Sequence, residues 1–245
     1  MLTMPASKTI ARDPRPNTVD GDTAAANHAR LADEIAAALA ETGYAITPHF
    51  LADDEVQGLA DEARTLWENG AFRHARVGLG DQASLQTEVR TDRVCWLDIA
   101  SATDAQRNLL QRLSDLREAV NRRTFAGLFD WEGHLALYPE GAFYRPHLDR
   151  FEAQSSRVLT TVLYLNTHDV RGAGGELRLW LETPPAQWRS PSGAPLDVVP
   201  HGGTLVTFWS DQFVHEVLPA RFERLSITGW FRHRTDNPLR NASMD

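Results

Sequence analysis

The sequence predicts an α+β fold in which N-terminal helices pack on one sheet of a β-sandwich or jelly roll. Apolar residues recur at helical spacing in the first half of the chain, whereas the second half contains short β-type runs divided by Pro, Gly and Asp turns. These runs follow one another without intervening helices, which favours a sandwich or jelly roll over alternating βαβ units. Because the helices alone have no second core to pack on, both halves are expected to form one domain.

Three helices are expected in the first half. In the first, over residues 28–41, apolar residues recur every four positions and Gly43 follows as a stop. The second begins at Asp53, a residue type that caps helix N-termini, and ends near Gly70. The third runs from about 104 to 125 with leucines at helical spacing. The first two carry their apolar residues on one stripe, so they are predicted to cover one face of a sheet.

Strand-like runs make up most of the remaining sequence. Residues 44–46 and 93–97 are predicted as short strands, and residues 74–90 as a mobile loop or a loosely paired hairpin. Six further runs follow, at His134–Tyr138, Val158–Leu165, Glu176–Leu181, Leu196–Val199, Thr204–Trp209 and Ser226–Arg232. The predicted organisation is a flexible tail over 1–27 and one domain over 28–236, helical in 28–130 and a jelly-roll core in 131–236.

Composition excludes several classes of function. The net charge of −8 and the pI near 5.6 argue against a nucleic-acid binder. No apolar run approaches the roughly 18–20 residues of a membrane span, so no membrane partner is expected. The single cysteine, Cys95, excludes an internal disulfide framework and a thiolate zinc site, and it suits the cytoplasm. Residues 1–27 lack the apolar core of a secretory signal. Nothing in the sequence sets the oligomeric state.

Three residues are candidate metal ligands. His147 and Asp149 lie two positions apart, so on an extended strand their side chains point to the same face. His215 offers a third ligand from a distant part of the chain. Two histidines and one carboxylate on one face of Fe(II) leave three positions open for a co-substrate and O2. The alternative is that His147 and Asp149 are polar residues on a surface strand.

Arg224 is a candidate anion-binding residue. On a strand it shares its face with Ser226 and Thr228, while the apolar residues between them face the other way. A buried guanidinium needs an anion, and it binds a carboxylate through two parallel hydrogen bonds. A dicarboxylate that chelates iron at one end and meets Arg224 at the other would satisfy both sites, and 2-oxoglutarate has that shape. The alternative is an ordinary ion pair with Glu176, Glu216 or Glu223.

The order of these four residues belongs to a wider pattern. Its other marks are GYAITPHFL, the strand 93–96, YPEGAFYRPHLD, TTVLYLN, GGELRLW, FWSD, HEVLPA and RLSITGWF. Over residues 38–234 the pattern resembles the Fe(II)- and 2-oxoglutarate-dependent dioxygenases, and within them the EGL-nine-type prolyl hydroxylases that act on hypoxia-inducible factor, with their bacterial relatives. The resemblance implies a double-stranded β-helix, or cupin-like jelly roll, as the core.

The resemblance also implies roles for individual residues. It places iron on His147, Asp149 and His215, and the 2-oxoglutarate carboxylate on Arg224 with help from the Tyr164 hydroxyl. The family positions that line the same pocket fall on Tyr144, Val162, Leu177 and Thr228. Without the resemblance, Tyr164 and Tyr144 would be interpreted as core aromatics. Trp209 and Trp230 are expected to pack in the barrel, and His134, His168 and His201 to be structural or surface residues.

The implied reaction converts 2-oxoglutarate and O2 to succinate and CO2 and hydroxylates an unactivated C–H bond, with ascorbate as a candidate reductant. A prolyl residue in a protein or peptide is the leading substrate, and the loop 74–90 could close over it. Hydroxylation of a free amino acid or another small metabolite is a second interpretation. A third is a non-catalytic sensor of iron, oxygen or 2-oxoglutarate. The chain departs from the family at Arg145-Pro146, by one residue before Gly174 and by one before His215, which puts the substrate in doubt rather than the metal site.

Overall fold

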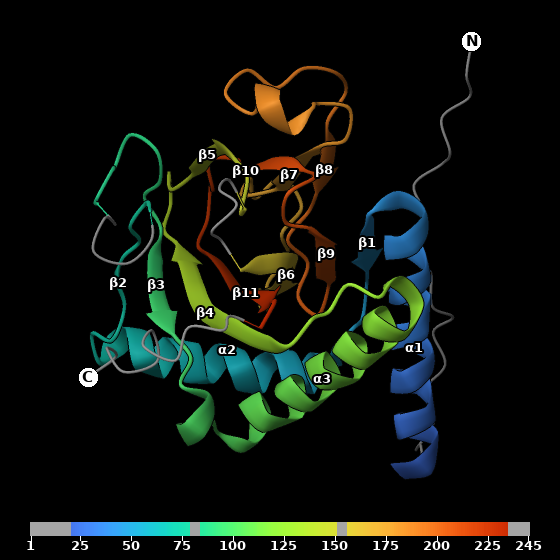
Figure 1. Cartoon of the computed structure of the whole chain (residues 1–245). Helices are drawn as coiled ribbons and strands as arrows, with labels where there is room; N and C mark the ends of the chain where they lie inside the picture. The colour runs from blue at the N-terminus through green and yellow to red at the C-terminus, as the bar shows by residue number, and fades with distance from the viewer. Residues whose placement is uncertain (1–20, 79–83, 151–155, 235–245) are drawn as a thin grey trace.

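A computed structural model describes residues 21–78, 84–150 and 156–234 of the chain, and two antiparallel sheets form its centre (Figure 1). The larger sheet has the order β1-β9-β6-β11-β4-β3-β2, and the smaller has the order β5-β10-β7-β8. The helices α2 and α3 lie on the side of the large sheet that faces away from the small one. The predicted α+β fold is confirmed, with a double-stranded β-helix as its core.

The elements have the following bounds. The helices are α1 (Gly21–Thr42), α2 (Asp53–Glu68) and α3 (Asp104–Thr124), with short 3-10 turns at Ile99–Ser101 and Pro185–Gln187. The large sheet contains β1 (Tyr44–Thr47), β2 (Arg73–His74), β3 (Arg93–Trp96), β4 (Asp130–Tyr138), β6 (Arg157–Tyr164), β9 (Leu205–Trp209) and β11 (Arg224–Arg232). The small sheet contains β5 (Tyr144–His147), β7 (Leu177–Trp180), β8 (Leu196–Val198) and β10 (Val214–Val217).

Two of the three helices differ from their prediction at their starts, whereas α3 begins at Asp104 as predicted. α1 begins at Gly21 rather than at 28, because the alanine-rich stretch before residue 28 favours helix by propensity without showing apolar periodicity. α2 is capped by Ala52 rather than Asp53, and the Ala52 N–H donates to the Glu55 carboxylate at 2.9 Å. None of the described helices is long and apolar enough to cross a membrane.

The two faces of the large sheet bury different sets of side chains. The apolar residues of β11 that were predicted to share one face, Leu225, Ile227 and Phe231, pack in the cluster that the helices cover. Val162 and Tyr164 of the neighbouring β6 belong to a second cluster, between the two sheets. The alternation along β11 therefore directs Arg224 and Ser226 away from the helices and toward the space between the sheets, as expected.

Two short strands complete the small sheet and carry site residues. β5 and β10 pair antiparallel, with His147 opposite His215. Asp149 lies just beyond the end of β5, in a bend, so the prediction that one strand carries both His147 and Asp149 is wrong. The loop predicted over 74–90 shows hairpin pairing between Val77 and Ser84 in its described part, with N–H···O distances of 2.9 Å in both directions.

Candidate metal and co-substrate site

The three predicted metal ligands meet between the two sheets. One ligand atom from each of His147, Asp149 and His215 lies within 4.8 Å of the others. The cross-strand pairing of β5 with β10 brings the two imidazole rings to a centroid distance of 4.1 Å. Asp149 adds a carboxylate whose Oδ1 is 3.8 Å from His147 Nε2 and whose Oδ2 is 3.4 Å from His215 Nε2.

Both histidine rings are oriented by backbone carbonyls. His147 Nδ1 lies 2.8 Å from the carbonyl oxygen of Arg145, and His215 Nδ1 lies 3.1 Å from that of Phe213. A carbonyl oxygen only accepts, so Nδ1 of each ring carries the proton. The Nε2 lone pairs are left for a metal, which is the tautomer that a metal-binding histidine needs.

The charges of the cluster suit a cation. Burial lowers the pKa of His147 well below its ordinary value, and the neighbouring His215 lowers it further, so the ring is neutral at pH 7. Burial alone would raise the pKa of Asp149, but His215, His147 and Arg157 outweigh it and hold that pKa at about 2. Two imidazoles and one carboxylate are the donor set of a non-haem Fe(II) site, so the residues present fit this metal.

Arg224 is a buried cation without a carboxylate partner among the described residues. Its side chain is 3% exposed and Nη1 donates to Ser226 Oγ at 3.1 Å, while Nε finds no acceptor. The ion pair considered above with Glu176, Glu216 or Glu223 is not formed in the described ranges; Glu216 instead lies 4.0 Å from Arg178. A guanidinium buried in this way calls for an anion from outside the chain.

Two tyrosines border this guanidinium. Arg224 Cζ lies 4.7 Å from the ring centroid of Tyr138 and 5.0 Å from that of Tyr164. The Tyr164 hydroxyl is buried and has no hydrogen-bond partner in the described part of the chain. Burial raises the pKa of Tyr164, so the hydroxyl keeps its proton and can donate it. The unused donors of Arg224 and Tyr164 together fit a carboxylate such as that of 2-oxoglutarate.

The remaining predicted pocket residues fall into two groups. Val162 and Leu177 are buried in the cluster between the sheets, and Thr228 lies opposite Val162 in the β6–β11 ladder. Tyr144 instead stacks on the imidazole of His147, with ring centroids 3.5 Å apart and an interplanar angle of 14°. Tyr144 therefore belongs to the surroundings of the metal ligands.

The two tryptophans expected to pack in the barrel do so. Trp209 donates its indole N–H to the carbonyl of Leu39 at 3.2 Å, which ties β9 to α1. Trp230 is buried, and its ring lies 6.3 Å from that of Trp96 and 5.5 Å from that of His134 between centroids. His134 is buried against the rings of Trp96 and Trp230, and burial lowers its pKa to about 4.

Sequence patterns missed a group of residues at the end of the loop 74–90. Asp92 is 1% exposed and pairs with Arg90 at 2.6 Å, and the Arg90 guanidinium lies 4.1 Å from the ring centroid of Tyr144. Backbone hydrogen bonds from Arg145 N–H to Val89 and from Thr91 N–H to Phe143 hold this segment against β5. No sequence signal marks such a contact, because it depends on how the loop docks.

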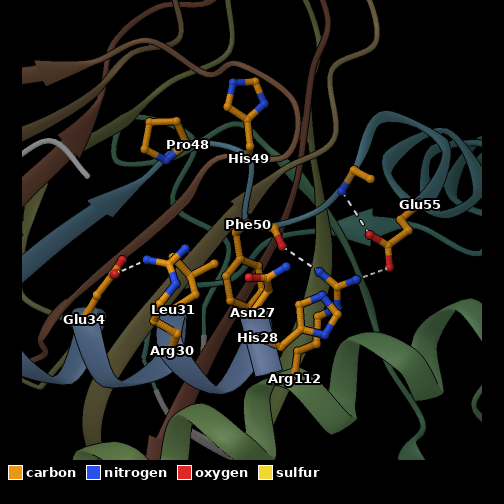
Figure 2. A pocket seen from close by; sticks show the side chains of 11 residues that line it. Asn27, His28, Arg30, Leu31, Glu34, Pro48, His49, Phe50, Glu55 and Arg112 are labelled. Atoms are coloured by element: carbon orange, nitrogen blue, oxygen red, sulfur yellow. Dashed lines mark hydrogen bonds and ion pairs between the residues drawn. The ribbon is translucent and has the colours of Figure 1, made fainter. Parts of the chain in front are cut away.

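The described part of the chain also has hollows outside the cluster. A pocket of about 100 Å³ is bordered by α1, the β1–α2 connection and α3, and Figure 2 shows Arg30 paired with Glu34 and Arg112 paired with Glu55 at its edge. Arg112 donates to the Phe50 carbonyl at 2.7 Å and to the Glu55 carboxylate. These hydrogen bonds connect α3 to the β1–α2 connection and to α2. A second hollow of about 780 Å³ is lined in part by the exposed residues His168 and His201.

Comparison with known proteins adds a family. Residues 133–232 match the model of the 2OG-Fe(II) oxygenase superfamily, and this range contains all four predicted chemical residues. The chain is 30% identical over 217 residues to the hypoxia-inducible factor prolyl hydroxylase of Caenorhabditis elegans, covering 84% of this chain and 29% of that one. The chain thus spans less than a third of that relative's length, and 43–55% of the Egl nine homologs 1 of rat, mouse and human.

Solved structures extend the comparison. A Pseudomonas putida prolyl-4-hydroxylase is 40% identical with a TM-score of 0.72, covering 83% of this chain and all of that one. A Trichoplax adhaerens prolyl hydroxylase, solved with a peptide of the hypoxia-inducible factor oxygen degradation domain, has a TM-score of 0.74 at 24% identity. It covers 93% of this chain and 99% of that one, which supports the fold.

Proposed function

The chain belongs to the 2OG-Fe(II) oxygenase superfamily, and from this premise we propose that it hydroxylates a prolyl residue of a protein or peptide. The observation that carries the proposal is the buried Arg224 guanidinium without a carboxylate partner, in the same fold as the cluster of His147, Asp149 and His215. An ordinary structural arginine would be paired, and an ordinary surface H-x-D would not meet a second histidine.

His147, Asp149 and His215 would hold Fe(II) in this proposal. When bound, iron with 2-oxoglutarate and O2 supplies the oxidising chemistry, in which 2-oxoglutarate becomes succinate and CO2 and one oxygen atom enters a C–H bond. The chain's own contribution is positioning. The Arg145 and Phe213 carbonyls fix the two imidazoles, and stacking against Tyr144 fixes the plane of the His147 ring.

Arg224 and Tyr164 would bind one carboxylate of 2-oxoglutarate. The guanidinium supplies a charge and two parallel N–H donors, and the tyrosine hydroxyl supplies a further donor. Val162 and Leu177 provide apolar walls that exclude water from the methylene part of the molecule. Ser226 holds one end of the guanidinium, so its plane is set before the ligand arrives.

A protein or peptide substrate is supported by the surface beside the cluster. Trp96 is 51% exposed and its ring contacts those of His134 and Trp230, which gives an extended chain an aromatic surface on which to pack. The relatives point the same way, since they include enzymes named as prolyl hydroxylases and one solved with a peptide. We extend the proposal to a cytoplasmic location, supported by the single cysteine, and to ascorbate as reductant, supported by the resemblance alone.

Succinate release with iron, 2-oxoglutarate and proline-containing peptides tests the proposal, with Asp149→Ala as the inactive control. Mass spectrometry of proteins that co-purify with that inactive variant would supply candidate substrates, which should gain one oxygen atom with active enzyme. Turnover of free proline without turnover of any peptide would favour the small-metabolite interpretation. Binding of 2-oxoglutarate without its consumption would favour the sensor.

A further inference from the structure

Asp149 takes part in a chain of buried hydroxyl groups. Thr160 Oγ1 donates to Asp149 Oδ2 at 2.7 Å. Thr160 Oγ1 also lies 2.9 Å from Ser210 Oγ. Thr160 and Ser210 have no exposed surface. Thr160 belongs to β6, Ser210 follows β9 and Asp149 follows β5, so three separate segments of the chain meet here.

The two hydrogen bonds of this series can have only one donor–acceptor direction. An ionised carboxylate accepts hydrogen bonds and cannot donate them, and each hydroxyl has a single proton. Because the Thr160 proton goes to Asp149, Thr160 can only accept from Ser210, and Ser210 must donate. The sequence of donors is therefore Ser210 to Thr160 to Asp149, and each bond polarises the next.

The backbone holds both hydroxyl groups in place. The Ser210 N–H donates to the Val158 carbonyl at 2.9 Å, and the Ser210 carbonyl accepts from the Arg150 N–H at 3.1 Å. Ser210 is thus tied both to the start of β6 and to the residue that follows Asp149. Thr160 lies in the middle of its sheet, between Phe208 and Trp230. The donor to Asp149 Oδ2 is therefore rigid, and it acts on one carboxylate oxygen only.

We propose that Thr160, oriented by Ser210, is a positioning residue that keeps Asp149 bound to the metal through a single oxygen. The inference rests on the proposed function. Two histidines and one carboxylate oxygen leave three coordination positions open, two for a chelating 2-oxoglutarate and one for O2. A carboxylate that bound through both oxygens would take the last of these. The hydrogen bond from Thr160 competes for Oδ2 and so keeps that position open.

Mn(II), which replaces Fe(II) without reacting with O2, is the probe for the test. Water-proton relaxation of the saturated Mn(II) protein reports how many water molecules occupy the open positions. In Thr160→Val the donor is lost at nearly constant volume, and relaxation should fall by roughly one third because one of the three open positions is taken. Thr160→Ser keeps the hydroxyl and should restore the wild-type value. Ser210→Ala leaves the donor in place and should have a smaller effect than Thr160→Val.

Thr207→Val is the matched control. Thr207 lies on β9, is completely buried, and its hydroxyl has no hydrogen-bond partner within the described ranges. The substitution repeats the same chemical change in the same sheet without touching Asp149, so relaxation should stay at the wild-type value. Equal relaxation in wild type and Thr160→Val would overturn the inference. An equal fall in Thr160→Val and Thr207→Val, or in Thr160→Val and Thr160→Ser, would overturn it as well.

Different results would refute the proposed function and the role of Thr160. A wild-type protein that binds no Mn(II) would overturn the proposed function together with the inference. A wild-type protein that binds Mn(II) and 2-oxoglutarate normally, with relaxation unchanged in Thr160→Val, would overturn the inference alone. A supporting result is a fall confined to Thr160→Val that is accompanied by weaker 2-oxoglutarate binding to the Mn(II) protein.

Discussion

Replacement of Arg224 by alanine tests the co-substrate assignment most directly. Arg224 is buried, and it has no acidic partner in the described part of the chain. Its guanidinium would therefore make a desolvated, two-bond contact with the 2-oxoglutarate carboxylate. Loss of one partner of such a contact costs on the order of 2–5 kcal/mol. At about 1.4 kcal/mol per tenfold change, the dissociation constant for 2-oxoglutarate should rise roughly 30-fold to several-thousand-fold.

The assay for this variant is calorimetric titration of the Mn(II) protein with 2-oxoglutarate, together with titration of the apoprotein with Mn(II). We expect the first affinity to fall and the second to stay near the wild-type value, because Arg224 is not among the clustered ligands. Arg178→Ala is the control, since Arg178 pairs with Asp197 and its side chain is 26% exposed. Unchanged 2-oxoglutarate affinity in Arg224→Ala, or an equal loss in Arg178→Ala, would refute the assignment.

Three further predictions concern the metal, the core and the glycines. His147→Ala should abolish tight Mn(II) binding; a variant that still binds the metal as wild type would remove this residue from the site. Burial lowers the pKa of His134 to about 4 in the folded protein. As the pH falls, the unfolded chain therefore takes up this proton before the folded chain does. The free energy of unfolding should fall by about 3 kcal/mol between pH 6.5 and pH 4. Denaturant unfolding across this range measures the effect, which should shrink in His134→Asn; an equal slope in the variant would contradict it. Gly175→Ala would place Cβ 3.0 Å from Arg224 Cδ and should weaken 2-oxoglutarate binding, whereas Gly70→Ala, with a similar positive φ and open space, should cost stability alone by about 1–2 kcal/mol.

The sequence predicts the parts of the site that repeat a local pattern. Alternation along a strand placed Arg224 and Ser226 opposite Leu225 and Ile227, and the structure confirms those faces. The packing of the helices on the large sheet also follows from periodicity, because a helix with one apolar stripe must bury that stripe against another element. Both predictions use only the spacing of apolar and polar residues that are close to one another in the sequence.

Features that depend on distant segments meeting were not predictable from the sequence. The pairing of Arg90 with Asp92 beside Tyr144 needs the docked position of a loop, and the contact of Thr160 with Ser210 needs the junction of β6 with the end of β9. Neither pair has a sequence signal beyond common polar residues. The start of α1 at Gly21 was missed for a different reason, since alanine favours helix without forming a stripe.

The pairing of β5 with β10 also determines how far the register of these two strands can change. His147 faces His215 across an antiparallel ladder, and a shift of one residue in such a ladder turns every side chain to the opposite face. A slip of one residue between the two strands would keep the sheet hydrogen-bonded but turn one imidazole away from the other. The candidate site therefore depends on the register of β5 against β10, and a connection of different length before His215, such as the one by which this chain departs from the family, is tolerated as long as that register is kept.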